Sequence, residues 1–216
     1  MKRVFLSLEA VFNVLYITFA LIFSFMLLFG KMQSPARMLA GAMALVLVGG
    51  DAFHLLPRIL AAYSAESEKY RNMLGRGKQI TSITMTVFYL LLFYIGVLSF
   101  LPQGIRGWTI IVYVLAAVRI ILCLLPQNKW LLQYPPVKWG VIRNIPFVLQ
   151  GAIVAGLFFI NKGAVQGLAL MWLAICLSFL FYLPVVLWAN KYAKIGMLML
   201  PKSCAYLWML AMCLSL

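Results

Sequence analysis

The segment MLAGAMALVLVGGDAFHLLPRILAAY (residues 38–63) carries Asp51, His54 and Arg58 within a long apolar run. A helix needs about 20 predominantly apolar residues to cross a bilayer, so this segment is long enough to be a membrane span. Ionisable side chains at membrane depth are costly and usually mark functional sites. In a helix, positions 51, 54 and 58 fall within about 60° of one another, so their side chains share one face. The segment therefore predicts a transmembrane helix with a polar site on one face.

The composition of the whole chain agrees with this assignment. The 216 residues are 65% hydrophobic and 10% charged, whereas a soluble domain has about 25% charged residues. We predict an all-α, polytopic membrane protein, in which a seven-transmembrane-helix bundle forms a single domain over residues 1–216. The predicted spans are Val4 to Gly30, Met38 to Tyr63, Ile80 to Phe100, Trp108 to Leu125, Trp139 to Ile160, Ala164 to Trp188 and Ile195 to Leu216.

The distribution of basic residues predicts the orientation of the chain. Of the 18 Lys and Arg residues, Arg119 lies inside a span, thirteen lie on the side of the N-terminus, and four lie on the opposite side, namely Lys31, Arg37, Arg106 and Lys162. Cytoplasmic segments of membrane proteins carry the excess of Lys and Arg. We therefore expect the N-terminus inside and the C-terminus outside, in a bacterial-type plasma membrane. The net charge of +14 is spread singly over connecting segments, so we expect no nucleic-acid partner.

Two further patterns have simple interpretations. Residues 64–79 form a hydrophilic stretch that we predict to be a cytoplasmic connection, with Gly75 to Lys78 as a flexible turn. The four cysteines show no Cys-x-x-Cys spacing and read as buried packing residues. With one histidine in the chain, a zinc site is not expected. We predict no metal and no cofactor.

Polar residues gather at one depth when the spans are aligned. Counted along each helix, they fall in the half of the membrane nearest the cytoplasm, whereas the outer halves are aliphatic or aromatic. This layer predicts one connected site. Its candidate ligand-binding residues are Glu9, Asn13, Asp51, His54, Arg58, Ser82, Thr86, Arg119, Tyr182, Lys202 and Tyr206.

Two interpretations of this layer remain open. In a structural network, Glu9 and Asp51 would neutralise Arg119 and Lys202 and the bundle would need no ligand. In a pocket, the excess of cations over acids, to which Arg143 also contributes, would favour an anionic partner. We prefer a cytoplasm-facing, net-positive pocket that binds or transports a small anionic or lipid-like molecule, with membrane lipids as the other partners.

Two alternative functions are compatible with the same residues. One is a lipid-modifying, hydrolase-like enzyme, in which Asp51 orients His54 as a general base. Asp51 and His54 are then the catalytic candidates. The other is a membrane scaffold without a ligand.

Two short motifs resemble a known family. Gly50-x-x-Phe53-His54 in the second span, together with an acid and an asparagine at the start of the first, resembles the CREST superfamily, which includes alkaline ceramidases and progestin and adiponectin receptors. The family carries Ser-x-x-x-His in the second helix, and a zinc ion held with two histidines of helix seven. His54 matches the family histidine, whereas Gly50 stands at the serine position, and Lys202 and Tyr206 are the nearest equivalents of the histidine pair. The family also carries an aspartate in helix three, which has no counterpart in this chain. The resemblance implies a seven-helix fold and a lipid-related activity, but the zinc ligands are missing.

Overall fold

A computed structural model describes residues 2–31, 34–64 and 67–216, which form helices joined by short turns and contain no strand. Seven helical segments in these ranges are long and apolar enough to cross a membrane. This confirms the predicted all-α, seven-helix membrane protein. The α-helices are α1 (Lys2–Phe29), α2 (Pro35–Tyr63), α3 (Arg71–Phe100), α4 (Arg106–Leu124), α5 (Val137–Ile160), α6 (Met171–Trp188) and α7 (Met199–Cys213).

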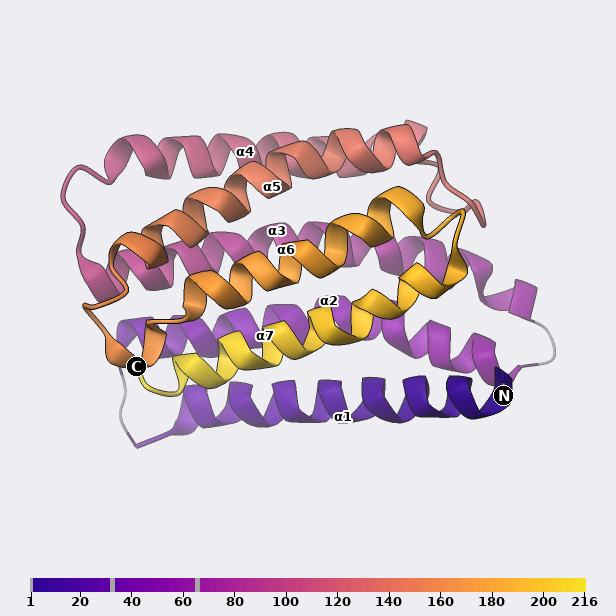
Figure 1. Ribbon diagram of the computed structural model, residues 1–216, viewed down its shortest axis with the longest axis horizontal. Coiled ribbons are helices and arrows are strands. Elements are labelled where there is room, and N and C mark those ends of the chain that lie inside the picture. The colour runs from indigo at the N-terminus through magenta and orange to yellow at the C-terminus, as the bar shows by residue number, and fades with distance from the viewer. Residues whose placement is uncertain (1, 32–33, 65–66) are drawn as a thin grey trace.

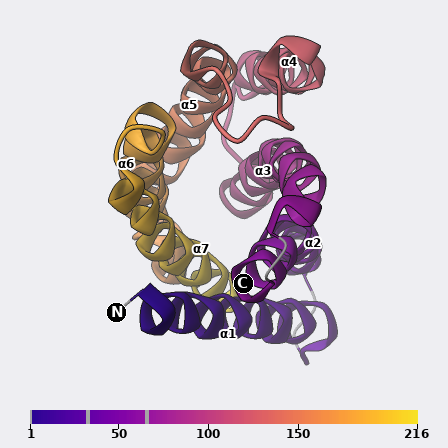
Figure 2. The same ribbon diagram turned by 90° about the vertical axis from the view of Figure 1, so that its right-hand side faces the viewer.

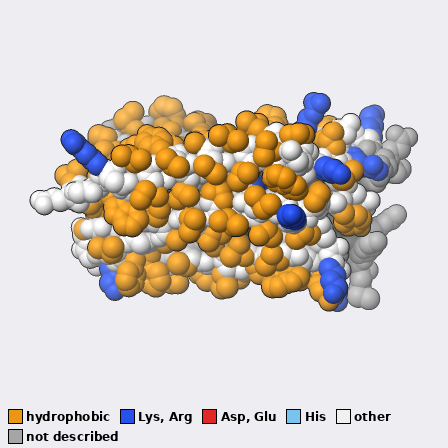
Figure 3. Space-filling model, turned by 90° about the horizontal axis from the view of Figure 1, so that it is seen from above, with side chains coloured by type: hydrophobic (Ala, Val, Ile, Leu, Met, Phe, Trp, Pro, Cys, Tyr) orange, Lys and Arg blue, Asp and Glu red, His pale blue; other side chains and the backbone are white. Residues whose placement is uncertain are grey.

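The helices run up and down, so the two ends of the chain lie at opposite ends of the bundle (Figure 1). Viewed from the end where α1 begins, α1, α2, α3, α5, α6 and α7 form a ring, and α4 lies outside it against α3 and α5 (Figure 2). Hydrophobic side chains cover the middle of the face in Figure 3, and Lys and Arg side chains appear mainly toward its two ends. This is the surface that a lipid environment requires.

The structure corrects several predicted boundaries. Helix α3 begins at Arg71 rather than Ile80, so the Gly75 to Lys78 segment is helical and not a flexible turn. Gly75 is buried, and a Cβ at this position would lie 2.6 Å from the carbonyl oxygen of Trp130. Tertiary packing of the α4–α5 connection thus orders a stretch whose composition resembles a loop.

The last two spans also differ from the prediction. The segment before α6 contains a short 3₁₀ helix, Gln166–Leu168, so the α-helix begins at Met171 instead of Ala164. Similarly, the 3₁₀ helix Ala193–Leu198 precedes α7.

Two cysteines, Cys176 and Cys204, are exposed, whereas Cys123 and Cys213 are buried as predicted. An apolar thiol has no strong preference for the interior when the outer surface faces lipid.

Helices α2 and α3 pack closely where the backbone of Phe53 faces Gly77. Pro57 has no N–H, so the carbonyl of Phe53 loses its helical partner four residues later. That carbonyl lies against Gly77 of α3, where any Cβ would overlap it. One helical turn further along α3, Thr81 donates a hydrogen bond of 2.7 Å to the carbonyl of Gly50. This contact fixes the position of His54 and Arg58 relative to α3.

Candidate functional site

Two adjoining cavities occupy the end of the bundle where α1, α3, α5 and α7 begin. The larger has a volume of about 360 Å³ and is lined by α2 to α7. The smaller, of about 90 Å³, lies between α1, α2, α3 and α7. The larger volume falls within the range of ligand pockets, about 300–1,000 Å³. Both cavities are lined by His54, Arg58, Thr81, Gly196, Met199 and Lys202.

The larger cavity is lined by basic side chains without an acid. Arg58, Lys78, Arg119, Arg143 and Lys202 all reach it, and its described lining residues include no Asp or Glu. Aromatic rings complete the wall. They belong to Trp130, Phe147 and Tyr182.

Arg119 is the most deeply buried of these cations. It extends from α4, outside the ring, and its Cζ lies 3.1 Å from the ring centroid of Phe147 on α5. Its side chain is 1% exposed, and its Nε and Nη1 atoms have no hydrogen-bond partner. In the part of the chain that the structure describes, no carboxylate lies within 4.0 Å of its guanidinium. An unpaired buried charge costs several kcal/mol, of the order of 3–5.

Arg143 lies one helical turn before Phe147 and is held by the α4–α5 connection. Its Nη1 donates to Oδ1 of Asn128 at 2.9 Å, and its Cζ lies 4.2 Å from the ring of Trp130. Trp130 is itself anchored, since its Nε1 donates to the carbonyl of Cys123 at 2.9 Å. The Nε of Arg143 is buried without a partner. This connection therefore fixes a second guanidinium beside the first.

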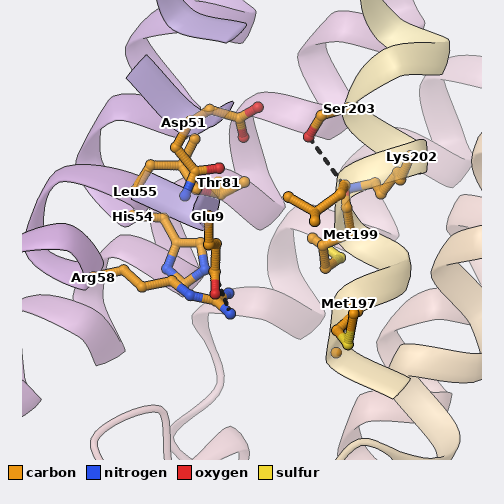
Figure 4. Close-up of a pocket in the computed structure, with 13 residues that line it drawn as sticks. Glu9, Asp51, His54, Leu55, Arg58, Thr81, Met197, Met199, Lys202 and Ser203 are labelled. Atoms are coloured by element: carbon orange, nitrogen blue, oxygen red, sulfur yellow. Dashed lines mark hydrogen bonds and ion pairs between the residues drawn. The ribbon is translucent and has the colours of Figure 1, made fainter. Parts of the chain in front are cut away.

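The smaller cavity contains the two membrane-depth acids. Glu9 and Arg58 form an ion pair at 2.7 Å. Asp51 accepts a hydrogen bond of 2.7 Å from the hydroxyl of Tyr16. Figure 4 shows these acids on one side of the cavity and Lys202 on α7 across from them.

A layer of aromatic side chains packs one to two turns deeper than the larger cavity. Tyr89 hydrogen-bonds to Ser178 at 2.8 Å and packs edge-on against Phe147, with centroids 5.1 Å apart. Phe88 packs against Tyr206 at 5.5 Å. Phe88, Tyr89 and Tyr206 are at most 2% exposed. These contacts make a closely packed layer below the cavity.

The structure brings nine of the eleven predicted ligand-binding residues to the two cavities. Thr86 and Tyr206 line neither. Thr86 is buried between helices, where its hydroxyl donates to the carbonyl of Ser82 and its own carbonyl accepts from Gln150. Tyr206 belongs to the aromatic layer. Glu9 and Asn13 reach only the smaller cavity, whereas Ser82, Arg119 and Tyr182 reach only the larger.

Two predicted pairings do not form. Glu9 pairs with Arg58, so it does not neutralise Arg119. Asp51 accepts from Tyr16, while Nδ1 of His54 is buried without a partner. The Asp51–His54 hydrogen bond that the hydrolase alternative requires is therefore not formed. Both outcomes have the same cause, because α1 packs against α2 and brings Glu9 to Arg58 and Tyr16 to Asp51.

Four cationic or aromatic residues that line the larger cavity are absent from the predicted site. The sequence predicts a turn at Lys78, although this residue lies one helical turn before Ser82 and so shares its face. Arg143 is predicted only as a nearby cation, outside the candidate site. Trp130 and Phe147 are aromatic, so the pattern of polar residues does not indicate them. The helical spacing of Arg143 and Phe147 was a usable clue, but only the fold brings Arg119 to the same place.

The arrangement defines a multi-pass membrane protein with a basic, aromatic-walled cavity at one end of its bundle. Within the described ranges, no group of three or more His, Cys, Asp or Glu side chains is placed to hold a metal ion. No protein-family model, no curated protein and no solved structure matches the chain. The site must therefore be interpreted from its own chemistry.

Proposed function

We propose that the protein binds a small anionic or lipid-like molecule in the larger cavity. The observation that carries this proposal is the buried guanidinium of Arg119, two of whose nitrogens have no hydrogen-bond partner, in a wall with four other cations and no described acid. A bound anion would supply the missing hydrogen bonds and offset the repulsion between the cations. Charge-assisted hydrogen bonds of this kind are roughly twice as strong as neutral ones.

The ion pair between Glu9 and Arg58 strengthens this argument. Because Glu9 is engaged by Arg58, it is not free to compensate the deeper cations. A structural network would pair each buried charge, since an uncompensated one is destabilising. The arrangement supports a ligand site better than a network that only holds the bundle together.

We further propose that the cavity opens to the cytoplasm of a bacterial-type plasma membrane. The bias of Lys and Arg toward the end that bears the N-terminus supports this orientation. The aromatic layer under the cavity supports binding or gated transport over a permanently open channel, because Tyr89 and Ser178 are buried there and hydrogen-bonded to each other.

The orientation can be tested with reporters at the two ends. We expect a reporter after Leu216 to be external and a tag inserted after Ser64 to be cytoplasmic. Paired phosphatase and fluorescent-protein fusions in cells would measure this. Fluorescence from the C-terminal fusion, with an externally accessible tag at Ser64, would reverse the topology and the side to which the cavity opens.

Anion binding can be tested by removing one cavity cation that makes no described hydrogen bond. We expect Lys78→Gln to weaken anion binding about tenfold, the equivalent of about 1.4 kcal/mol. Melting temperatures of purified protein would be followed against acetate, methyl sulfate, citrate and inorganic phosphate at constant ionic strength. Anions such as phosphate also stabilise folded proteins by exclusion from their surface, so the signal is the difference between wild type and variant.

Arg106→Gln is the matched control, because it removes one exposed cation at the opposite end of the bundle. It should respond to every anion as the wild type does. If all anions act equally on the wild type, Lys78→Gln and Arg106→Gln, the proposed function is wrong.

A further inference from the structure

We infer that the bound anion is a phosphate group held between the guanidinium groups of Arg119 and Arg143, an inference that rests on the proposed anion-binding function. The two side chains come from different helices but meet on one face of α5. Arg119 lies over Phe147, and Arg143 projects from the preceding turn of the same helix. Both line the larger cavity.

The aromatic contacts leave the guanidinium edges for a ligand. Arg119 rests on Phe147 and Arg143 on Trp130, so each ring contacts a guanidinium face. Nε and Nη1 of Arg119 and Nε of Arg143 are buried and unpartnered. Planar guanidinium edges bind phosphate through two parallel hydrogen bonds. Unpartnered N–H groups from two guanidinium groups around one cavity match a group with several equivalent oxygens.

The charge that remains uncompensated also favours a phosphate. Arg58 is paired with Glu9, and Asp51 faces Lys202 across the smaller cavity. This leaves Lys78, Arg119, Arg143 and Lys202 without a described carboxylate within 4.0 Å. A phosphate monoester carries about −1.5 to −2 charges at pH 7. It therefore neutralises this cluster better than a single carboxylate or a sulfate monoester.

Apolar side chains near Arg143 suit the carbon part of such a molecule. Val185 and Val186 of α6 and Val137 of α5 line the same cavity and are apolar. The shared chemistry is thus a phosphate monoester with an attached carbon group. It can come from a membrane lipid with a terminal phosphate or from a small soluble phosphate ester.

Calorimetric titration of the full chain in phosphatidylcholine nanodiscs tests this inference. The soluble probes are inorganic phosphate, glycerol phosphate, methyl sulfate and acetate. A second preparation contains phosphatidate in the nanodiscs, and its effect on melting temperature is compared with that of phosphatidylglycerol. We expect phosphate monoesters to bind at least tenfold more tightly than methyl sulfate or acetate. Stabilisation by phosphatidate alone would identify a lipid as the source of the phosphate.

Arg119→Lys and Arg143→Lys separate phosphate recognition from simple attraction. Each keeps its positive charge but loses the planar fork, so the tenfold preference for phosphate should disappear while weak anion binding persists. Arg106→Lys at the opposite end should keep the preference. Equal affinities for all the anions in the wild type would overturn the phosphate assignment and leave anion binding intact. An absence of binding by every probe would overturn both.

Discussion

Arg119→Met is expected to weaken binding of inorganic phosphate or phosphatidate by at least about a hundredfold, or about 2.8 kcal/mol, without lowering the melting temperature. Truncating one partner of a buried, hydrogen-bonded charge pair typically costs 2–5 kcal/mol of binding. The empty protein, however, gains from the change. Its guanidinium is 1% exposed with two unpartnered nitrogens, and an apolar side chain of similar length removes that desolvation cost. Titration calorimetry and thermal unfolding would be measured on the same samples.

Arg37→Met is the reciprocal control. At the opposite end of the bundle, Arg37 donates to the carbonyls of Leu214 at 2.8 Å and Met26 at 3.1 Å. Its loss should lower the melting temperature and leave anion binding unchanged. If Arg119→Met instead behaves like Arg37→Met, with lower stability and intact binding, Arg119 is a structural residue and the cavity loses its main ligand group.

Gly77→Ala should strongly lower the stability of the bundle. A Cβ at this position would overlap the carbonyl oxygen of Phe53, and it would lie 2.9 Å from Cα of His54. These are backbone atoms, so α2 and α3 must separate. Overpacking of this kind costs about 1–3 kcal/mol and occasionally more. Because α2 carries His54 and Arg58, anion affinity should fall with the melting temperature.

Gly49→Ala is the matched comparison, since a Cβ at Gly49 meets nothing within 4 Å. Alanine there should be neutral or stabilising by up to about 1 kcal/mol, the difference in helix propensity between the two residues. Unfolding in detergent, followed by circular dichroism, would measure both variants. Equal stability of Gly77→Ala and Gly49→Ala would contradict the close contact between α2 and α3.

The sequence alone determined the class of the protein and the depth of its polar layer. Apolar runs of membrane length leave few alternatives to transmembrane helices, because every backbone polar group must be satisfied inside the bilayer. Asp51, His54 and Arg58 were found for the same reason, since ionisable residues are conspicuous in such runs. The helical period then placed them on one face.

Only the tertiary structure decided which charges are paired. Arg119 and Arg143 are far from adjacent in sequence, and they meet because α4 packs on α5 and the α4–α5 connection folds back onto α3. Likewise, the pairing of Glu9 with Arg58 depends on how α1 lies against α2. Periodicity fixes the face of one helix but not its rotation or height against a neighbour, and ion pairs form or fail over a few ångströms.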